Sequence, residues 1–385
     1  MFKKTFLAQV IFTLLFGVSI IACSKNSSST SKLASSEPLP YTKELNIYNW
    51  GDYIAPGVIK SFEKETGIKV SYDTFDSNEL LQAKLVAGSS GYDIVVPSAP
   101  WADVQIRAGL LQKLHKELIP NLKNENPSVQ RKLAVFDPGN NYLVNWALIY
   151  DTLGINTVKV NKALGNMPLP DNKWDLLFKP EYMAKLSTCG VTIIDSPSEI
   201  IPQTLAYLGK NPYSAKKEDY IEVDKVLKAI RPYVTRIASS GHIDDLANGT
   251  ICMAFAYSGD MNIARKRAIE NKTNQDVKAL LPKTSVILEP DSMAIPIDAK
   301  NVRNANLFMN YMLRPEVQAT TTNIMLYPTA NSAAQKYINS QVLENQGYVF
   351  PTDAELESME IGRRPNLLVN RMQTRCFSRF KTDNY

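Results

Sequence analysis

Apolar and polar positions follow a strand-like period and then a helix-like period, in turn, over residues 44–114. Short apolar runs alternate with segments in which apolar residues recur every three or four positions. The predicted strands are Glu44–Tyr48, Ile68–Phe75 and Asp93–Pro97, and the predicted helices are Ala55–Glu65, Asp76 to about Ala87, and Pro100 to about Leu114. This repetition predicts an α/β fold with a parallel sheet and helices on both of its faces.

The first two of these helices carry signals for their ends. Pro56 lies in the first turn of the first helix and Gly67 follows its last turn, which are the positions that these residue types favour. The sequence Asp76-Ser77-Asn78-Glu79 has the spacing of a capping box, so it is expected to open the second helix. Gly88 is expected to close that helix.

The pattern is less regular in the centre of the chain, where Pro168, Pro170 and Pro180 interrupt it. Strands are predicted at Val191–Asp195, Ile251–Ala256 and Ser292–Pro296, and helices at Glu199–Leu208, Glu218–Leu227, Ile243–Asn248 and Asn301–Leu313. Neither an internal repeat nor a glycine-rich phosphate loop is evident in the sequence.

Residues 1–22 are typical of an export signal. Lys3 and Lys4 precede an apolar run from Phe6 to Ile21 that is too short to span a bilayer comfortably. Ile20-Ile21-Ala22-Cys23 resembles a bacterial lipobox, which predicts that Cys23 is acylated and anchors the chain to a membrane face. The alternative is an ordinary signal peptide with an incidental cysteine.

Residues 23–41 are predicted to form a flexible tether, because they are rich in serine, polar and interrupted by proline. About 345 residues remain after the tether, which is more than one hydrophobic core usually supports, so two lobes are expected. No second hydrophobic span is evident, and the body of the chain is therefore expected to be soluble.

The charge balance argues against nucleic acid as a partner. The chain has 43 lysine and arginine residues against 38 acidic residues, for a net charge of +5. Its only histidines are His115 and His242, and it lacks a CxxC motif, so neither a His/Cys metal site nor a cofactor is expected.

The segment Trp50-Gly51-Asp52-Tyr53 places two aromatic residues beside a carboxylate at the end of a predicted strand. Ring faces attract an organic ammonium ion and a carboxylate neutralises it. Other such residues lie in loops beside strand ends, where open α/β sheets bind ligands. The carboxylates are Asp52, Glu199, Asp260 and Asp291, and the aromatics are Trp50, Tyr53, Tyr257 and Tyr327. Taken singly, each also fits a turn, a cap or simple packing.

Longer motifs occur between Leu45 and Thr382. They include YNWGDY (48–53), FDSNE (75–79) and DDLANG (244–249), together with the less specific FEKETGIKV (62–70). In these motifs the chain resembles the polyamine branch of the periplasmic solute-binding proteins of ABC importers, in particular its putrescine-binding members. The resemblance implies a two-lobed periplasmic binding protein fold of type II, with a mixed sheet flanked by helices in each lobe and hinge strands between them.

The resemblance also implies the extent of each lobe and one covalent link. Lobe 1 would comprise residues 42–148 and about 286–331, and lobe 2 about 149–285 and 332–385. Such lobes close around a ligand. Cys189 and Cys252 match a pair that forms a disulfide in putrescine binders, whereas Cys376 has no counterpart; the alternative is three free thiols.

The residues that match ligand contacts of the family come from both expected lobes. They are Trp50, Asp52, Tyr53, Ser98, Glu199, Ser239, Tyr257, Asp260, Glu289, Asp291 and Tyr327. Trp50 would form a wall of an amine box and Asp52 would take one ammonium group. Carboxylates at both ends would offset the cost of burying a dication, and aromatics would cover its methylene chain.

The chain departs from the family pattern at several of these positions. Gly51 replaces a serine or threonine, Tyr257 replaces a tryptophan, and Glu289 stands where an aromatic is usual. Glu289 either faces the pocket, where it would favour a longer, more charged or guanidinium-bearing amine, or points to solvent. The segment Trp146–Tyr150 also departs from the small residues usual there.

The resemblance implies a lipid-anchored periplasmic protein, expected to be a monomer, that delivers a polyamine to an ABC permease and catalyses no reaction. Putrescine is the favoured ligand, with spermidine and agmatine as the alternatives. One alternative is a polyamine-sensing lipoprotein that signals to a membrane receptor. Another is a binding protein of the same fold for a different small solute. An exported hydrolase or lyase is a third, but no Ser-His-Asp pattern is evident.

Overall fold

Parallel pairing organises the N-terminal sheet. The computed structural model describes residues 39–51, 53–238, 240–282, 284–343 and 351–385. Strand β1 (Glu44–Trp50) pairs in parallel with β2 (Lys69–Phe75) on one side and β3 (Ile94–Val95) on the other. The connecting helices are α1 (Val58–Thr66), α2 (Asn78–Val86) and α3 (Ala99–Arg107). The predicted alternation of strand and helix is confirmed.

The larger sheet is mixed, with strand order β12-β10-β5-β8-β6-β7 and β9 also paired with β5. Its strands are β5 (Val144–Asn156), β6 (Val191–Ile193), β7 (Arg236–Ile237), β8 (Met253–Tyr257), β9 (Val277–Leu280), β10 (Ile287–Met293) and β12 (Glu360–Ile361). β6 runs parallel to β7 and β8, whereas β5 runs antiparallel to β8, β9 and β10. The short strands β4 (Leu111–Gln112) and β11 (Ile295–Pro296) form a separate pair.

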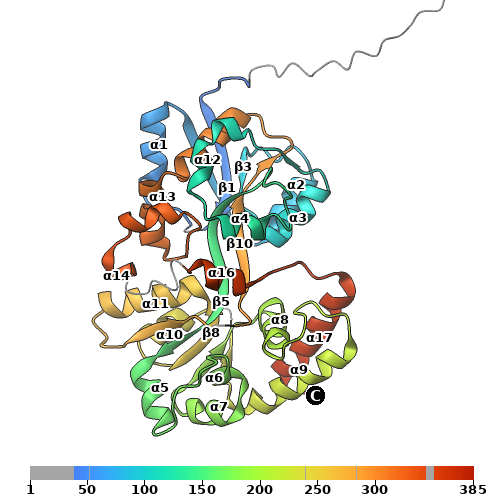
Figure 1. Ribbon diagram of the computed structural model, residues 1–385, viewed down its shortest axis with the longest axis vertical. Coiled ribbons are helices and arrows are strands. Elements are labelled where there is room, and N and C mark those ends of the chain that lie inside the picture. The colour runs from blue at the N-terminus through green and yellow to red at the C-terminus, as the bar shows by residue number, and fades with distance from the viewer. Residues whose placement is uncertain (1–38, 52, 239, 283, 344–350) are drawn as a thin grey trace, which may run out of the picture. The chain divides into compact units, whose positions relative to one another are not determined.

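Strands β5 and β10 connect the two lobes (Figure 1). β5 has 13 residues and is buried along nearly its whole length. Its first half pairs with β10, where Ala147 faces Asp291 and Ile149 faces Glu289, and its second half pairs with β8 and β9. The two strands therefore have the position of the hinge strands that the fold implies.

The remaining helices pack around these sheets. They are α4 (Pro127–Leu133), α5 (Thr157–Leu164), α6 (Asp175–Phe178), α7 (Pro180–Leu186), α8 (Pro197–Tyr207), α9 (Lys217–Ile230), α10 (His242–Ala247), α11 (Ser258–Glu270), α12 (Val302–Met312), α13 (Pro315–Met325), α14 (Ser340–Leu343), α16 (Asp353–Ser358) and α17 (Leu367–Thr382). Single 3-10 turns occur at Lys116–Leu118, Pro120–Asn124, Ser187–Cys189, Arg231–Tyr233 and Ser332–Tyr337.

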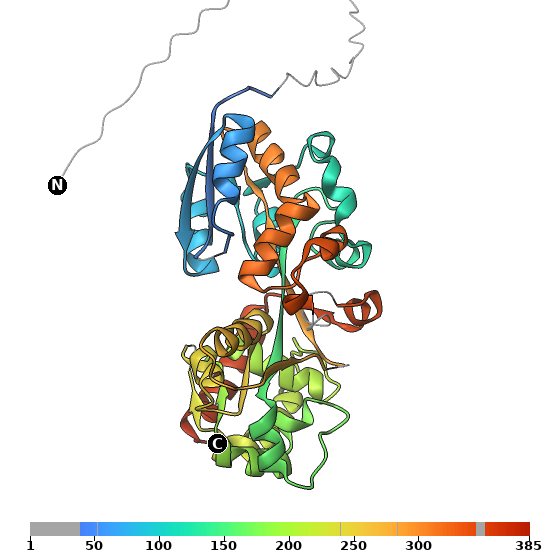
Figure 2. The ribbon, with the colours of Figure 1, turned by 90° about the vertical axis from the view of Figure 1, so that its left-hand side faces the viewer.

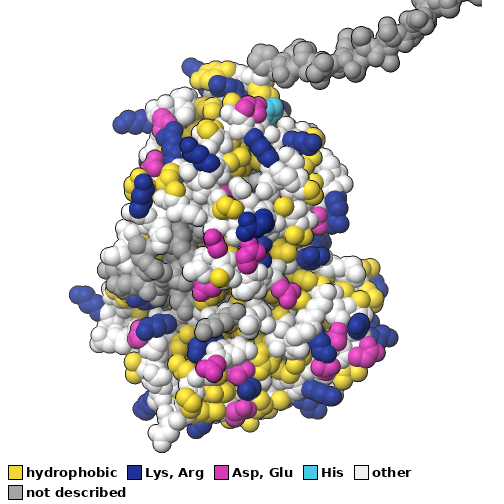
Figure 3. Space-filling view, in the orientation of Figure 1, with side chains coloured by type: hydrophobic (Ala, Val, Ile, Leu, Met, Phe, Trp, Pro, Cys, Tyr) yellow, Lys and Arg dark blue, Asp and Glu magenta, His cyan; other side chains and the backbone are white. Residues whose placement is uncertain are grey.

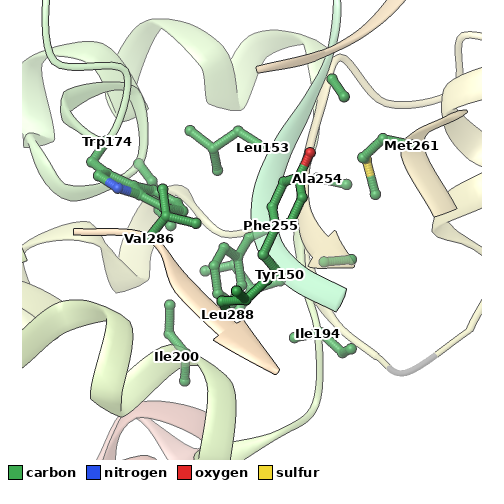
Figure 4. Packing of buried hydrophobic residues seen from close by; sticks show 14 of the residues in the cluster. Tyr150, Leu153, Trp174, Ile194, Ile200, Ala254, Phe255, Met261, Val286 and Leu288 are labelled. Carbon is green, nitrogen blue, oxygen red and sulfur yellow. The ribbon is translucent and has the colours of Figure 1, made fainter. Parts of the chain in front are cut away.

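Segments far apart in the sequence share each hydrophobic core. Figure 2 shows α1 and α12 side by side, and Phe62 packs edge-on against Phe308 with 5.1 Å between ring centres. In the other lobe, Leu153 of β5 packs near Phe255 of β8 and Leu288 of β10 (Figure 4). The chain therefore crosses between the lobes more than once, and each lobe is built from discontinuous segments.

Two expectations about these elements were wrong, and one strand was missed. The third helix ends at Arg107 instead of Leu114, because Gly109 has a φ of +68° that no helix continues through, and β4 follows. The N-cap of α2 is Ser77, whose hydroxyl accepts the N–H of Leu80, so Asp76 lies outside the helix. β5 was not among the predicted strands, and its antiparallel pairing makes the larger sheet mixed, as the resemblance implied.

Cys189 and Cys252 are joined by a disulfide in the structure. Cys376 is a buried free thiol on α17 and donates a hydrogen bond to Asp224 over 2.9 Å. No helix among the residues that the structure describes has the length and apolar character that a membrane span requires.

Several expectations lie outside the described residues. The signal peptide and Cys23 belong to residues 1–38, as does most of the predicted tether. Asp52 and Ser239, two of the expected ligand contacts, are also outside the described part of the chain. The exact lobe boundaries stay a prediction.

Candidate functional site

A cavity of about 850 Å³ lies where β1, α3, α8, β8 and β10 approach one another. It is lined by acidic, aromatic, small polar and aliphatic side chains, and also by the basic side chains of Lys266, Arg267, Arg363 and Arg364. Eight of the expected contact residues line it, namely Trp50, Tyr53, Ser98, Glu199, Tyr257, Glu289, Asp291 and Tyr327. Residues that are separate in the sequence are therefore brought to one place.

Trp50 is fixed at the end of β1. Its indole N–H donates to the backbone oxygen of Val96 over 3.0 Å, and its ring packs against Phe75 with 4.6 Å between centres. These contacts hold the ring from the protein side, so its remaining surface is available to the cavity.

Asp291 is buried and held by two hydroxyl groups. The hydroxyl of Tyr53 donates to its Oδ2 over 3.0 Å, and Ser98 also donates to the carboxylate. Burial raises the pKa of Asp291 to about 6, although both hydrogen bonds act in the opposite direction. Burial therefore brings the pKa of this carboxylate closer to neutral pH, and a cation beside it would favour its charged form.

Ser98 is itself positioned by α2. Its backbone N–H donates to Oδ1 of Asn78 over 3.2 Å, and Nδ2 of Asn78 donates to its hydroxyl oxygen over 3.0 Å. The FDSNE motif thus supports the cavity wall through Asn78, a role that the sequence did not indicate.

Asp260 lies behind Tyr327, and it is not among the residues that line the cavity. Its Oδ1 accepts the hydroxyl of Tyr327 over 3.3 Å, and its Oδ2 lies 2.8 Å from Nε2 of His242. A side chain at Gly259 would meet the Tyr327 ring at 2.3 Å, so glycine is required for this approach. Asp260 therefore reaches a ligand only by exchanging one of these partners.

His242 is a buried residue that sequence reasoning had treated as structural. Its Nε2 faces Asp260, while its Nδ1 has no hydrogen-bond partner among the described residues. The imidazole fixes the position of Asp260 from the side that faces away from Tyr327.

Three carboxylates meet at the β5 end of the cavity. Glu199 accepts the hydroxyl of Ser198 over 3.1 Å and that of Tyr257 over 3.4 Å. Asp151 of β5 hydrogen-bonds to Glu199, and Glu289 of β10 is close enough to raise the pKa of Asp151. Burial is the main reason that the pKa of each of the three is raised.

Asp151 and Trp101 are site residues that sequence reasoning missed. A lone carboxylate inside the apolar run Trp146–Leu153 was the available signal for Asp151, since a charge is expensive within a buried strand. Trp101 lines the cavity from α3, and the guanidinium of Arg364 stacks on its ring. Only the fold brings Arg364, at the far end of the chain, to this place.

The cavity has the chemistry of a cation site. The described residues contain no group of three or more His, Cys, Asp or Glu side chains arranged to hold a metal ion. In contrast, ring faces and paired carboxylates can replace the hydration of an organic cation. The surface view in Figure 3 shows acidic and basic side chains interspersed over the described part of one face.

Two lobes on hinge strands, with a cavity between them, define the class of the solute-binding proteins. The sequence profile of the bacterial extracellular solute-binding proteins matches residues 57–347. This chain belongs to that family.

Relatives of known function match over most of the chain. The putrescine-binding periplasmic protein SpuD of Pseudomonas aeruginosa is 42% identical over 342 residues, which are 88% of this chain and 92% of SpuD. The putrescine-binding periplasmic protein PotF of Escherichia coli is also 42% identical, over 344 residues and the same shares of the two chains. A putrescine/agmatine-binding protein of Pseudomonas aeruginosa is 36% identical, over 88% of this chain and 92% of its own.

Solved structures share the fold. The spermidine/putrescine substrate-binding protein PotD of Streptococcus pneumoniae superposes with a TM-score of 0.77 at 26% identity, over 89% of this chain and 99% of that one. A putative spermidine/putrescine ABC transporter protein of Listeria monocytogenes gives 0.71 at 30% identity, over 89% and 100%. The type II periplasmic binding protein fold is thereby confirmed.

Proposed function

We propose that this protein captures a polyamine in its interlobe cavity and delivers it to an ABC permease. The observation that carries the proposal is the cavity itself, in which Glu199, Glu289 and Asp291 face the same space as Trp50 and Tyr257. The names of the relatives, which bind putrescine, spermidine or agmatine, support the same class of ligand.

The ligand contacts that we propose are those expected from the sequence, with Asp151 added. Asp291 and Tyr53 would receive one cationic end of the ligand, together with Asp52. Glu199 and Glu289 would receive the other end, and Asp260 would contribute through exchange of its Tyr327 partner. Ser239 and Ser98 would supply polar contacts.

The proposal includes the organisation of the whole chain. Residues 42–148 and about 286–331 would form one lobe, and about 149–285 and 332–385 the other. Cys23 would carry the lipid anchor on the outer side of the cytoplasmic membrane or on the outer membrane, and residues 23–41 would tether a monomer to it. No chemical reaction is part of this function.

Calorimetric titration with putrescine, cadaverine, agmatine, spermidine and spermine tests the proposal. The purified protein is first unfolded and refolded, so that any co-purified ligand is removed. Butane-1,4-diol, which has the length of putrescine but no charge, is the matched control ligand. At least one amine is expected to bind, and the diol is expected to give no binding signal. If no amine binds, or if the diol binds, a polyamine function is refuted.

A further inference from the structure

Glu199 and Glu289 come from different elements and both line the cavity, and Asp151, which is not among the lining residues, hydrogen-bonds to Glu199. Asp151 is 3% exposed and Glu199 is 8% exposed. Asp151 hydrogen-bonds to Glu199, and the negative charges of Glu199 and Glu289 both raise the pKa of Asp151. Because a hydrogen bond between two carboxyl groups needs a proton, one of this pair is protonated in the empty protein, and the structure favours Asp151 as its holder.

Lys266, Arg267, Arg363 and Arg364 also line the cavity, but Lys266 pairs with Glu270 and Arg267 with Asp244, and in the described part of the chain none of the four forms an ion pair with Asp151, Glu199 or Glu289. The other titratable groups that act on these three carboxylates are Tyr257 of β8, Tyr213, and Asp291 of β10. The backbone of Glu289 pairs with β5, whereas its carboxylate lines the cavity and forms no hydrogen bond or ion pair with the residues that the structure describes. Asp151 likewise has no partner beyond Glu199 in the described part of the chain. An acidic side chain that faces a cavity unpaired points to a cationic group supplied by a ligand.

We propose that Glu199 and Glu289 clamp the guanidinium end of a guanidinium-bearing amine, while protonated Asp151 holds Glu199 in position. This inference rests on the proposed function and narrows its ligand class. A guanidinium presents five N–H donors in a plane, so it can pair with two carboxylates at once, whereas an ammonium offers three donors from one point. Glu199 is on α8 and Glu289 on β10, so the two carboxylates approach from different elements, as the two edges of a planar fork require.

The other end of the ligand has its own partner at a suitable distance. Glu289 and Asp291 are two residues apart on β10 and both line the cavity, which separates their Cα atoms by about 7 Å. A short methylene chain can therefore connect a guanidinium at Glu289 to an ammonium at Asp291.

Binding by this route exchanges a proton for the ligand. Burial and the charges of Glu199 and Asp291 raise the pKa of Glu289 well above its usual value, so before a cation binds Glu289 holds its proton more tightly than an exposed glutamate does. An incoming guanidinium lowers that pKa, and the Glu289 proton passes to the buffer as the ion pair forms. Asp151 keeps its proton, because its hydrogen bond to Glu199 is needed in the complex as well.

The test compares agmatine with putrescine, which have the same four-carbon chain and differ only in the guanidinium. Calorimetry in phosphate and in Tris gives the number of protons released, because these buffers have different ionisation enthalpies. Agmatine is expected to bind at least tenfold more tightly than putrescine at pH 7 and to release up to one proton, with affinity rising as the pH rises. Equal or weaker agmatine binding, or tighter binding of spermidine than of agmatine, would overturn the inference.

Three variants separate the roles. Glu289→Gln is expected to abolish the proton release and the preference for agmatine. Asp151→Asn, which keeps a neutral donor toward Glu199, is expected to retain the proton release and the preference for agmatine within about threefold. Asp151→Ala is expected to weaken the binding of agmatine and of putrescine. Asp171→Asn removes an exposed loop carboxylate and serves as the control. Unchanged proton release in Glu289→Gln, or an Asp151→Asn variant as weak as Asp151→Ala, would contradict the assignment.

The wild-type titrations keep this inference distinct from the proposed function. If neither agmatine, putrescine nor spermidine binds, the polyamine function itself fails. If all three bind without a preference for agmatine, the function stands and only the guanidinium clamp is lost. The wild-type pH dependence decides the question even where a variant does not fold.

Discussion

The guanidinium carbon of Arg364 lies 3.6 Å from the centre of the Trp101 ring. Trp101 belongs to α3, whereas Arg364 follows β12. This stack therefore joins two segments that are far apart in the sequence, and both residues line the cavity. Both side chains are accessible to solvent, Arg364 more than Trp101. Such a contact would form when the lobes close and would break when they open.

Arg364→Ala is expected to weaken ligand binding about two- to fivefold, mainly through faster dissociation. An exposed cation–π pair contributes about 0.5–1 kcal/mol, which corresponds to that range. Stopped-flow measurement of the dissociation rate tests this. Arg303→Ala is the matched control, because Arg303 stacks on Tyr41 at 5.3 Å and does not line the cavity. Equal rates in the two variants would show that the stack has no part in closure.

Asp260→Ala is expected to lower diamine affinity at least tenfold. Loss of a charge-assisted pair accounts for about 1.4 kcal/mol or more, and Tyr327 and His242 would also lose their common partner. Isothermal titration with putrescine measures the effect. Asp103→Ala, which removes a surface carboxylate paired with Arg107, should leave affinity unchanged. Normal putrescine affinity in Asp260→Ala would remove Asp260 from the site.

Glu125→Gln is expected to stabilise the protein above pH 7. Burial raises the pKa of Glu125 to about 7, although the N–H of Asn145 donates to its carboxylate. Its folded-state pKa is above the unfolded value of 4.5, so its contribution to stability is complete below pH 4.5 and is lost as the pH rises through 7.

A neutral glutamine avoids this loss, so the free energy of unfolding at pH 8 should exceed that of the wild type by about 3 kcal/mol. The difference should shrink to near zero by pH 4, as urea denaturation at both pH values would measure. A difference that is the same at pH 4 and pH 8 would mean that Glu125 is not titrating in this range.

Replacement of both Cys189 and Cys252 by alanine is expected to lower the free energy of unfolding by about 4 kcal/mol. The bond closes a loop of 63 residues, and the chain-entropy model gives a loss of that order when such a loop is released. Urea denaturation of the double variant and the wild type measures it. In the presence of a reducing agent the two proteins should become equally stable, and a persistent difference would assign the effect to packing instead.

Local signals were sufficient for the N-terminal elements. Glycine, proline and capping residues marked the ends of α1 and α2 to within a few positions, because these ends depend on residues that are adjacent in the sequence. β5 lacked such signals, since Val144–Asn156 is buried on both sides and its apolar run has neither a period of two nor a period of 3.6. Only its pairing with β8, β9 and β10 makes it a strand.

Some residues of the candidate site can likewise be identified from local sequence signals, whereas others are identified only by contacts in the folded chain. Trp50 and Tyr53 follow the predicted strand Glu44–Tyr48 in one motif, so their position at the cavity could be expected from the sequence. Asp291 was expected in a loop beside a strand end, whereas it lies inside β10 and lines the cavity from the strand itself. Asp151 could not be assigned from local signals, because its partners Glu199 and Glu289 are 48 and 138 residues further along the chain. The orientation of Glu289 was left open by the sequence, and the structure places it on the cavity wall.

Glu289 and Asp291 lie on β10, one of the two strands that join the lobes, so part of the charge that would meet the ligand is carried by the hinge itself. The hinge strands themselves move little when the lobes close, but a slight bend in them displaces the outer edge of a lobe by several times as much. Residues that bind the cationic groups of the ligand would therefore also belong to the hinge about which the lobes close. Substitutions that alter cargo preference at these positions would also alter the fraction of closed molecules offered to the permease. Affinity and transport rate should consequently change in different proportions.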